Sequence, residues 1–289
     1  MARAIRSWDD YFIPGTEVLK NKFNETDPEL LARSEELATA LRLQQLWVEP
    51  LPGHFDYNHM KAIHRYIFQD VYDWAGEERV GPLGWMSKGG PDVVNFAPGD
   101  PNAPMVPYSY YPGAGVAEAA ADRYRLLARD NNLVGLPRAE FIAQLAEHWA
   151  ELNVVHSFRE GNTRTQFVFF SQLVHEAGFE LDTESFKFGG PLRDEFVWAR
   201  FHSQATGTSK RLAGVLDRGI SETRSPSSLA SPVARDRATA DRANEAVQLA
   251  SSDFPKSATA AAKQRPTPPA RPGTSTRSPA QDRTNGMER

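Results

Sequence analysis

Apolar residues return every three or four positions over most of the first 220 residues, and this spacing predicts a mainly helical protein. In one such segment Met60 and Ile63 share a face, as in a helix buried along one side. The expected helices span residues 29–46, 57–74, 116–129, 137–155, 161–178, 192–204 and 211–218. The first of them carries Leu30, Leu37 and Leu41 on one face, which we expect to pack on its neighbours.

One segment, residues 80–112, breaks this pattern because it is rich in Gly and Pro. Short extended pieces at residues 84–87 and 93–96 are expected to form a β-hairpin that acts as a flap. A turn signal lies between them, at Lys88, Gly89 and Gly90. The predicted fold class is therefore all-α, with a small β-hairpin flap and a disordered C-terminal tail.

Composition changes sharply near residue 222. The chain is 40% hydrophobic overall, but Phe254 is the only aromatic residue in the last 65 or so positions, which are rich in Ser, Ala, Pro and Arg. Such a segment buries too little apolar surface to offset the entropy lost on ordering. We expect one domain over residues 1–221, with its core at about 11–204, and a disordered tail over 222–289.

Charge and cysteine content exclude several classes of function. The net charge is −4, and because the tail has 11 Arg and Lys against 7 Asp and Glu, the folded part is near −8. A domain of that sign is a poor nucleic-acid binder. The absence of Cys excludes disulfides, zinc thiolate sites and Cys nucleophiles. No signal-type or membrane-length apolar run is visible, so we expect a protein without a membrane partner that is cytoplasmic at least at synthesis, with later secretion into a host cell left open.

The densest chemistry lies in ten consecutive residues, HSFREGNTRT, at positions 156–165. Here one helix is expected to end and the next to begin at Gly161, Asn162 and Thr163. The first N–H groups of a helix lack internal partners and carry partial positive charge, so such a loop is an anion site. Asn162 can add a side-chain donor, and Arg164 can add a charged fork to a phosphate oxygen.

Two further residues of this run suggest a reaction at the bound anion. A carboxylate beside phosphates needs a cation between them, and Glu160 with phosphate oxygens suits Mg²⁺. His156 titrates near neutrality and can take a proton from an attacking hydroxyl. The alternatives are purely structural: His156 as a hydrogen-bonded histidine between helices, and Glu160 with Arg159 and Arg164 as a surface ion-pair cluster. A transition-metal site of His156 with two residues of the preceding helix is a weaker alternative, because it lies past the helix end.

The order H-x-F-x-E-G-N-x-R closely resembles the signature of the Fic family within the Fic/Doc superfamily, whose bacterial members include toxins and effectors. FIPGTEVLKNK at residues 12–22 and AIHRYIFQDVYDWAGE at residues 62–77 are also similar to that family. The resemblance implies transfer of AMP from ATP to a Tyr, Thr or Ser hydroxyl of a target protein.

The resemblance also implies a role for each residue of the motif. His156 would be the base and Glu160 the Mg²⁺ ligand. The nucleotide phosphates would be bound by Gly161, Asn162, Thr163 and Arg164. The target segment would dock on the flap at Lys88, Gly89 and Gly90.

Three departures from the signature qualify this picture. Ser157 replaces the usual Pro, Thr163 replaces a second Gly, and Phe167 stands in place of a second Arg. In the family that Arg contacts the γ-phosphate and pairs with the Glu of an inhibitory motif, and no segment here fits that motif. We therefore expect a protein that is not self-inhibited, although a small antitoxin-like partner in trans stays open. Transfer of another nucleotide or a phosphocholine-type group, and a non-catalytic interaction protein, also stay open.

Overall fold

A computed structural model describes residues 5–187 and 189–223, and the tail expected from residue 222 onward lies almost wholly outside these residues. The helices are α1 Pro28–Val48, α2 Tyr57–Phe68, α3 Val116–Arg129, α4 Arg138–Val155, α5 Asn162–Glu176, α6 Thr183–Phe186, α7 Arg193–Thr206 and α8 Lys210–Gly219. The strands are β1 Met86–Pro91, β2 Met105–Tyr110, β3 Phe179–Leu181 and β4 Ile220–Glu222. The fold class expected from the sequence, mainly helical with a small β-hairpin, is confirmed for the described residues.

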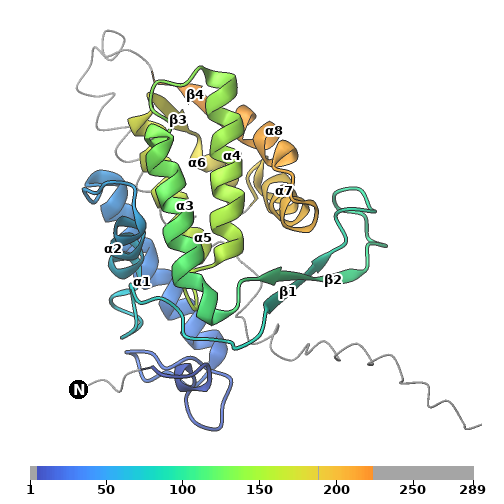
Figure 1. Cartoon of the computed structure of the whole chain (residues 1–289). Helices are drawn as coiled ribbons and strands as arrows, with labels where there is room; N and C mark the ends of the chain where they lie inside the picture. Colours follow the sequence, from blue (N-terminus) through green and yellow to red (C-terminus); the bar gives the residue numbers. More distant parts are fainter. Residues whose placement is uncertain (1–4, 188, 224–289) are drawn as a thin grey trace, which may run out of the picture.

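Helices α4 and α5 lie at the centre, and α2, α3, α7 and α8 pack around them (Figure 1). Their contact is built from aromatic rings: Trp149 of α4 stacks on Phe170 of α5 at 4.5 Å and meets Phe167 edge-on at 5.1 Å. Phe196 of α7 closes the cluster, 5.1 Å from Phe167. Such ring pairs combine a large buried area with specific geometry, so they fix the two central helices relative to each other.

Local sequence signals set several helix ends. Asp27 caps α1 by accepting hydrogen bonds from the N–H groups of Glu29 and Leu30, and Pro28 follows at the first helical position. At the other end of α5, Gly178 takes a left-handed φ of +88°, as expected for a glycine just past a helix. These ends agree with the predicted ones to within two residues.

The apolar face expected for α1 is wrong. The three leucines share a face, but that face is open to solvent, because Leu30, Leu37 and Leu41 are 49%, 75% and 54% exposed. The opposite face is the buried one, and it includes Leu43 and Leu46. α1 is thus held to the body partly by polar side chains, which an apolar pattern does not reveal.

The flap is a hairpin as predicted, but its strands are placed differently. β1 pairs antiparallel with β2, and residues 92–104 connect them, so the expected second strand at 93–96 lies in this connection. Lys88, Gly89 and Gly90 are not a turn but the middle of β1, opposite residues 106–108. The hairpin projects from the helical body beside α7 (Figure 1).

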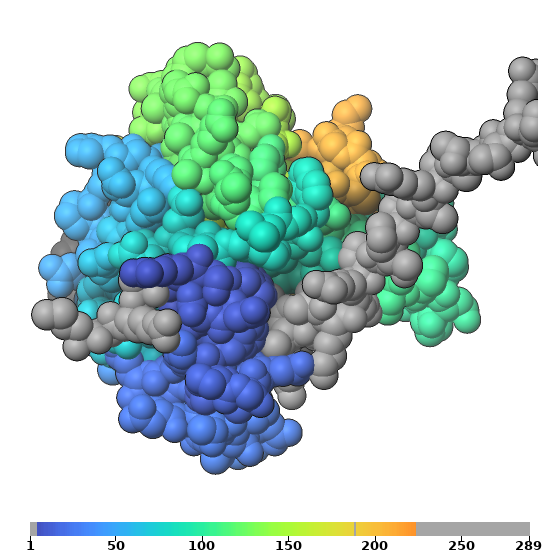
Figure 2. Space-filling model, turned by 60° about the horizontal axis from the view of Figure 1, so that its bottom comes forward, coloured from blue at the N-terminus to red at the C-terminus, as the bar shows by residue number. Residues whose placement is uncertain are grey.

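The N-terminal residues pack on the segment that leads into the flap, and the two lie together on one face in Figure 2. The hydroxyl of Tyr11 accepts a hydrogen bond from the N–H of Val80 at 3.0 Å. Tyr11 also meets Trp74 edge-on at 5.4 Å. None of the helices in the described part of the chain combines the length and apolar character needed to cross a bilayer.

Candidate active site in the loop between α4 and α5

Two left-handed residues shape the loop between the central helices. His156, directly after α4, has φ +51°, and Gly161, directly before α5, has φ +77°. A Cβ atom added at Gly161 would lie 2.1 Å from Cζ of Phe68, so both the backbone angle and the space require glycine there. The sequence-predicted end of one helix and start of the next are therefore confirmed at this loop.

The side chain of Asn162 holds the loop from inside. Its Oδ1 accepts from the N–H of Phe158 at 2.9 Å, and its Nδ2 donates to the carbonyl of the same residue at 2.7 Å. Asn162 was expected to add a donor for the anion, whereas the structure uses its amide to close the turn. The backbone N–H groups at the start of α5 remain directed along the helix axis toward the loop.

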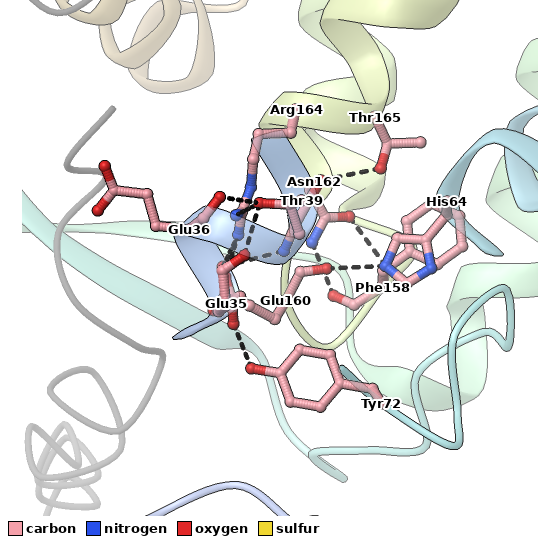
Figure 3. A network of polar contacts seen from close by, with 11 residues as sticks. Glu35, Glu36, Thr39, His64, Tyr72, Phe158, Glu160, Asn162, Arg164 and Thr165 are labelled. Atoms are coloured by element: carbon pink, nitrogen blue, oxygen red, sulfur yellow. Dashed lines mark hydrogen bonds and ion pairs between the residues drawn. The ribbon is translucent and has the colours of Figure 1, made fainter. Parts of the chain in front are cut away.

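His64 of α2 packs against the loop, and the sequence pattern had not marked it as a site residue. Its Nδ1 accepts from the N–H of Gly76 at 2.8 Å, so its Nε2 carries the proton and donates to the carbonyl of Glu160 at 3.1 Å (Figure 3). The ring stacks on Phe158 at 3.9 Å. Burial lowers the pKa of His64 from 6.5 to about 3, and the neutral ring fixes the position of the loop.

The lowered pKa of His64 is expected to make the free energy of unfolding depend on pH. Between pH 6.5 and about 3 the unfolded chain binds a proton at this residue and the folded chain does not, so stability falls as pH falls. The slope from one such group is at most about 1.4 kcal/mol per pH unit. Urea unfolding of wild type and His64→Gln at pH 7 and pH 5 should show a smaller loss of stability in the variant. Equal losses would contradict this role.

His156 lies in the site with its ring 4% exposed, 4.3 Å from the ring of Tyr110 on β2. Burial lowers its pKa well below 6.5, and the positive charges of Lys88, Arg79 and Arg200 lower it further. The backbone of Asn153 acts on the pKa in the opposite direction. The imidazole is therefore neutral at pH 7, which is the form that can accept a proton.

Arg79 joins the base of the flap to the loop, and nothing in the sequence pattern had marked it. Its Nε donates to the carbonyl of His156 at 2.7 Å, and its two Nη atoms donate to the carbonyls of Gly81 at 2.6 Å and Tyr111 at 2.5 Å. Its side chain is almost wholly buried, and burial lowers its pKa to about 10, so it stays charged. Arg79 thus fixes His156 and the flap relative to each other.

Glu160 stands on the other side of the loop, with its side chain 23% exposed. Burial raises its pKa, but the charges of Lys88 and Arg164, together with a 2.9 Å hydrogen bond from the N–H of Gly161, outweigh burial. The net pKa lies below 4.5, so the carboxylate is ionised at neutral pH. Lys88 of β1 is thus close enough to act on both Glu160 and His156.

Arg164, expected at the phosphates, points toward α1 (Figure 3). Its Nη2 donates to Glu35, its Nη1 lies 3.1 Å from Oγ1 of Thr39, and it is 4.0 Å from Glu160. The other carboxylate oxygen of Glu35 accepts from the hydroxyl of Tyr72. This nearly buried group is the polar attachment of α1, and it replaces the apolar contact that the leucine pattern suggested.

Glu35→Gln is expected to lower the free energy of unfolding by about 2 kcal/mol. The amide keeps an acceptor but leaves the charge of Arg164, whose side chain is only 12% exposed, without its carboxylate partner on α1. Glu36→Gln is the matched control, because that side chain points away from the network in Figure 3. Chemical denaturation should separate the two variants, and equal stabilities would contradict the assigned role of Glu35.

Arg159 is a fully buried guanidinium, whereas the alternative interpretation of the sequence had placed it in a surface ion-pair cluster. It lies 4.4 Å from the ring of Trp8 and 5.1 Å from the ring of Phe12. Its three nitrogen atoms have no hydrogen-bond partner within residues 5–187 and 189–223. With Arg159 in the core and Arg164 attached to α1, a surface ion-pair cluster around Glu160 is excluded.

The weaker alternative, a transition-metal site of His156 with two residues of α4, is also not formed. His148 lies 3.2 Å from Asp130, and Glu151 lies 2.7 Å from Arg123. The described part of the chain contains no group of three or more His, Cys, Asp or Glu residues that could hold a metal ion by itself. The site instead brings a neutral His156 and an ionised Glu160 together at the start of α5, among several positive charges.

Comparison with known proteins agrees with this geometry. A model of the Fic/DOC family matches residues 54–174. A probable protein adenylyltransferase Fic of Escherichia coli K12 is 32% identical over 173 residues, which are 60% of this chain and 76% of that protein. The probable protein adenylyltransferase y4lH of Sinorhizobium fredii is 35% identical over 175 residues, 60% of this chain and 79% of that protein.

The chain belongs to the Fic/DOC family. The Fic-domain structure of the translocated effector BepC of Bartonella tribocorum superposes with a TM-score of 0.60 at 23% identity, over 75% of this chain and 98% of that one. The Fic domain of Bep8 of Bartonella sp. 1-1C gives a TM-score of 0.59 at 26% identity, over 77% and 98% of the two chains. The predicted family is therefore confirmed, together with the relationship to proteins named adenylyltransferases.

Proposed function

We propose that the protein transfers AMP from ATP to a Tyr, Thr or Ser hydroxyl of a target protein. The observation that carries this proposal is the pairing of a neutral, buried His156 with an ionised Glu160 on either side of the N-terminus of α5. Its support from comparison is that relatives are named protein adenylyltransferases, and that the BepC structure contains bound AMPPNP.

His156 takes the proton of the attacking hydroxyl in this proposal. A neutral imidazole has one ring nitrogen without a proton, and that nitrogen accepts the proton. The backbone N–H groups of Asn162 and Thr163, together with Gly161, bind the nucleotide phosphates. Arg164 acts on the phosphates mainly through its charge, because its guanidinium is attached to Glu35.

A divalent cation fits beside Glu160. Mg²⁺ commonly takes one or two protein carboxylates and completes its shell with phosphate oxygens and water, so one ionised carboxylate at an anion site is a suitable donor set. When bound there, Mg²⁺ would neutralise charge on the phosphates during transfer. Glu160 would hold it, and the hydrogen bond from the N–H of Gly161 keeps the carboxylate oriented.

The flap is the proposed docking element for the target. The ring of Tyr110 on β2 lies 4.3 Å from that of His156, and Lys88 of β1 acts electrostatically on both His156 and Glu160, so the flap borders the proposed reacting groups. Within the described residues the flap is a sheet of two strands, which leaves an outer edge of β1 for an added strand. A target segment bound there would present its hydroxyl near His156, with Gly89 allowing close approach, while Gly90 lets β1 pack on Tyr108 and Phe201.

We propose that the protein is not regulated by an inhibitory Glu that pairs with an Arg, because Phe167 stands at the position of that Arg. Phe167 is 1% exposed among Trp149, Phe196 and Phe186, so position 167 belongs to the core and offers no charge to an inhibitory carboxylate. Purified protein is expected to be active without removal of any partner. Activity that appears only after a small antitoxin-like protein is stripped away would contradict this expectation.

A panel of donors tests the function. The protein is incubated with Mg²⁺, cell lysate and labelled ATP, GTP, UTP, CTP or CDP-choline, and label on protein is counted. AMP transfer predicts labelling from α-labelled ATP above all other donors. Labelling from another donor alone would replace the proposal by transfer of that group. Neither labelling nor nucleotide binding would indicate an interaction protein.

A further inference from the structure

Arg200 brings a guanidinium from a third helix to the start of α5. It lies on α7 and is 7% exposed. Its Nη2 donates to Oδ1 of Asn153 on α4, and its Nη1 lies 3.4 Å from Oγ1 of Thr163 in the first turn of α5. Burial lowers its pKa to about 10, so the group is charged at neutral pH. A planar fork that contacts the first turn of α5 is within reach of an anion seated there.

Arg200 acts on the same side of the site as His156. Its charge lowers the pKa of His156 and of Lys88, and the ring of Tyr110, which touches His156, in turn acts on Arg200. The carboxylate of Glu160 on the other side is lowered by Lys88, Arg164 and Arg159. Arg200 therefore acts on the end of the site where the proton is taken, while Lys88 acts on both ends.

α5 itself does not place a cation at the end of the site near His156. Arg164 is attached to Glu35 on α1, and Phe167, one turn after Thr163, is enclosed in the core. The guanidinium of Arg200 lies 5.4 Å from the ring of Phe196, which packs on Phe167. The apolar wall of these two rings thus holds Arg200 against the first turn of α5.

We propose that Arg200 binds the phosphate that is transferred beside His156, an assignment that rests on the AMP transfer proposed above. In that reaction the hydroxyl oxygen of the target bonds to the α-phosphorus, and its proton passes to His156. The bond from the α-phosphorus to the bridging oxygen breaks, and pyrophosphate leaves with the electron pair. Arg200 donates to a non-bridging α-phosphate oxygen throughout and stabilises the charge that develops on it.

The test compares Arg200→Gln and Arg200→Lys with Arg211→Gln. Arg211 lies on α8, with its guanidinium 4.5 Å from the ring of Trp198 on α7 and 3.5 Å from the carbonyl of Val93, so it controls for loss of a cation near α7. For each variant, thermal unfolding, affinity for AMP and the rate of label transfer from saturating α-labelled ATP are measured. AMP is the informative probe because it carries only the phosphate that Arg200 is assigned to bind.

Arg200→Gln is expected to weaken AMP binding about 10-fold and to lower the transfer rate about 10²-fold, whereas Arg211→Gln changes neither. Arg200→Lys should fall between wild type and the glutamine variant, since it keeps the charge without the fork. Removing the charge should also move the acidic limb of the rate profile to higher pH, because Arg200 lowers the pKa of His156. That shift follows from the charge alone, so the affinity for AMP is the readout that separates phosphate binding from a brace to Asn153.

The assignment of Arg200 to the phosphate and the proposed AMP transfer can be overturned independently of each other. If the folded glutamine variant binds AMP and transfers label as wild type does, the assignment of Arg200 is overturned while AMP transfer stands. If wild type binds AMP but labels no protein, AMP transfer is overturned, and the AMP affinities still decide for or against Arg200. If the glutamine variant does not fold, an unchanged rate in Arg200→Lys overturns the assignment and a lowered rate supports it.

Discussion

Replacing His156 with alanine is expected to lower the rate of AMP transfer by about 10²–10⁴-fold while ATP still binds. The neutral ring is the proposed base, and the proposed phosphate-binding groups come from the backbone of α5, so binding and proton transfer are separable. Label transfer from α-labelled ATP gives the rate, and calorimetry gives the affinity. His175→Ala at the exposed end of α5 is the matched control.

The dependence of the wild-type transfer rate on pH should also reflect a base that is neutral near pH 7. Because burial and nearby cations hold the pKa of His156 well below 6.5, the base is already deprotonated at pH 7. The rate is therefore expected to stay level from pH 8 to pH 6.5 and to fall only in more acidic solution. A rate that halves near pH 6.5, or a His156→Ala variant that transfers label at the wild-type rate, would contradict the assignment of His156 as the base.

Gly161→Ala is expected to destabilise the fold by roughly 3–5 kcal/mol. The substitution imposes a left-handed φ of +77° on a residue with a Cβ and drives that atom to 2.1 Å from the ring of Phe68. Nucleotide binding should be lost with it, since the N-terminus of α5 cannot keep its position. Urea unfolding and ATP calorimetry measure the two effects.

Gly178→Ala separates strain from collision in this prediction. Gly178 lies past the other end of α5 with a similar φ of +88°, but a Cβ there meets nothing within 4 Å. Its cost should be limited to backbone strain, about 1–2 kcal/mol. If both alanine variants lose the same stability, or if Gly161→Ala still binds ATP as wild type does, the close packing of the loop on Phe68 is not what holds the site.

Most helices were predictable because their signals are local, although the helix expected over residues 57–74 ends at Phe68. The apolar spacing and end residues of α4 and α5 depend on neighbours in the chain, and both helices were placed within two residues. The buried face of α1 was not predictable, because Glu35 attaches it to Arg164 and Tyr72, which lie far away in the sequence. Its exposed leucines follow the same spacing as a buried face would.

The flap shows the same limit for strands. Lys88, Gly89 and Gly90 have the composition of a turn, yet they form the centre of β1 because β2 pairs with them across the hairpin. Strand pairing depends on such non-local contacts more than on propensity. The position of the flap was predictable from its Gly and Pro content, whereas its register was not.

The residues of the candidate site were also predictable only in part. The order of His156, Glu160 and Gly161 predicted the central chemistry, because both helix ends meet in one short loop. The groups that tune it, including His64, Arg79 and Arg200, come from other elements and carry no local signal of their role. The sequence therefore indicated which residues are candidates for the reaction, and the fold adds the charges that act on their pKa values.

The mass of the modified target tests the central claim most directly. Lysate is incubated with wild type, ATP and Mg²⁺, and in parallel with the His156→Ala variant, and modified peptides are identified by mass spectrometry. The account predicts peptides that carry one AMP on a Tyr, Thr or Ser hydroxyl, present with wild type and absent with the variant. Peptides that carry phosphate or another group, or AMP adducts of equal abundance in both reactions, would contradict it.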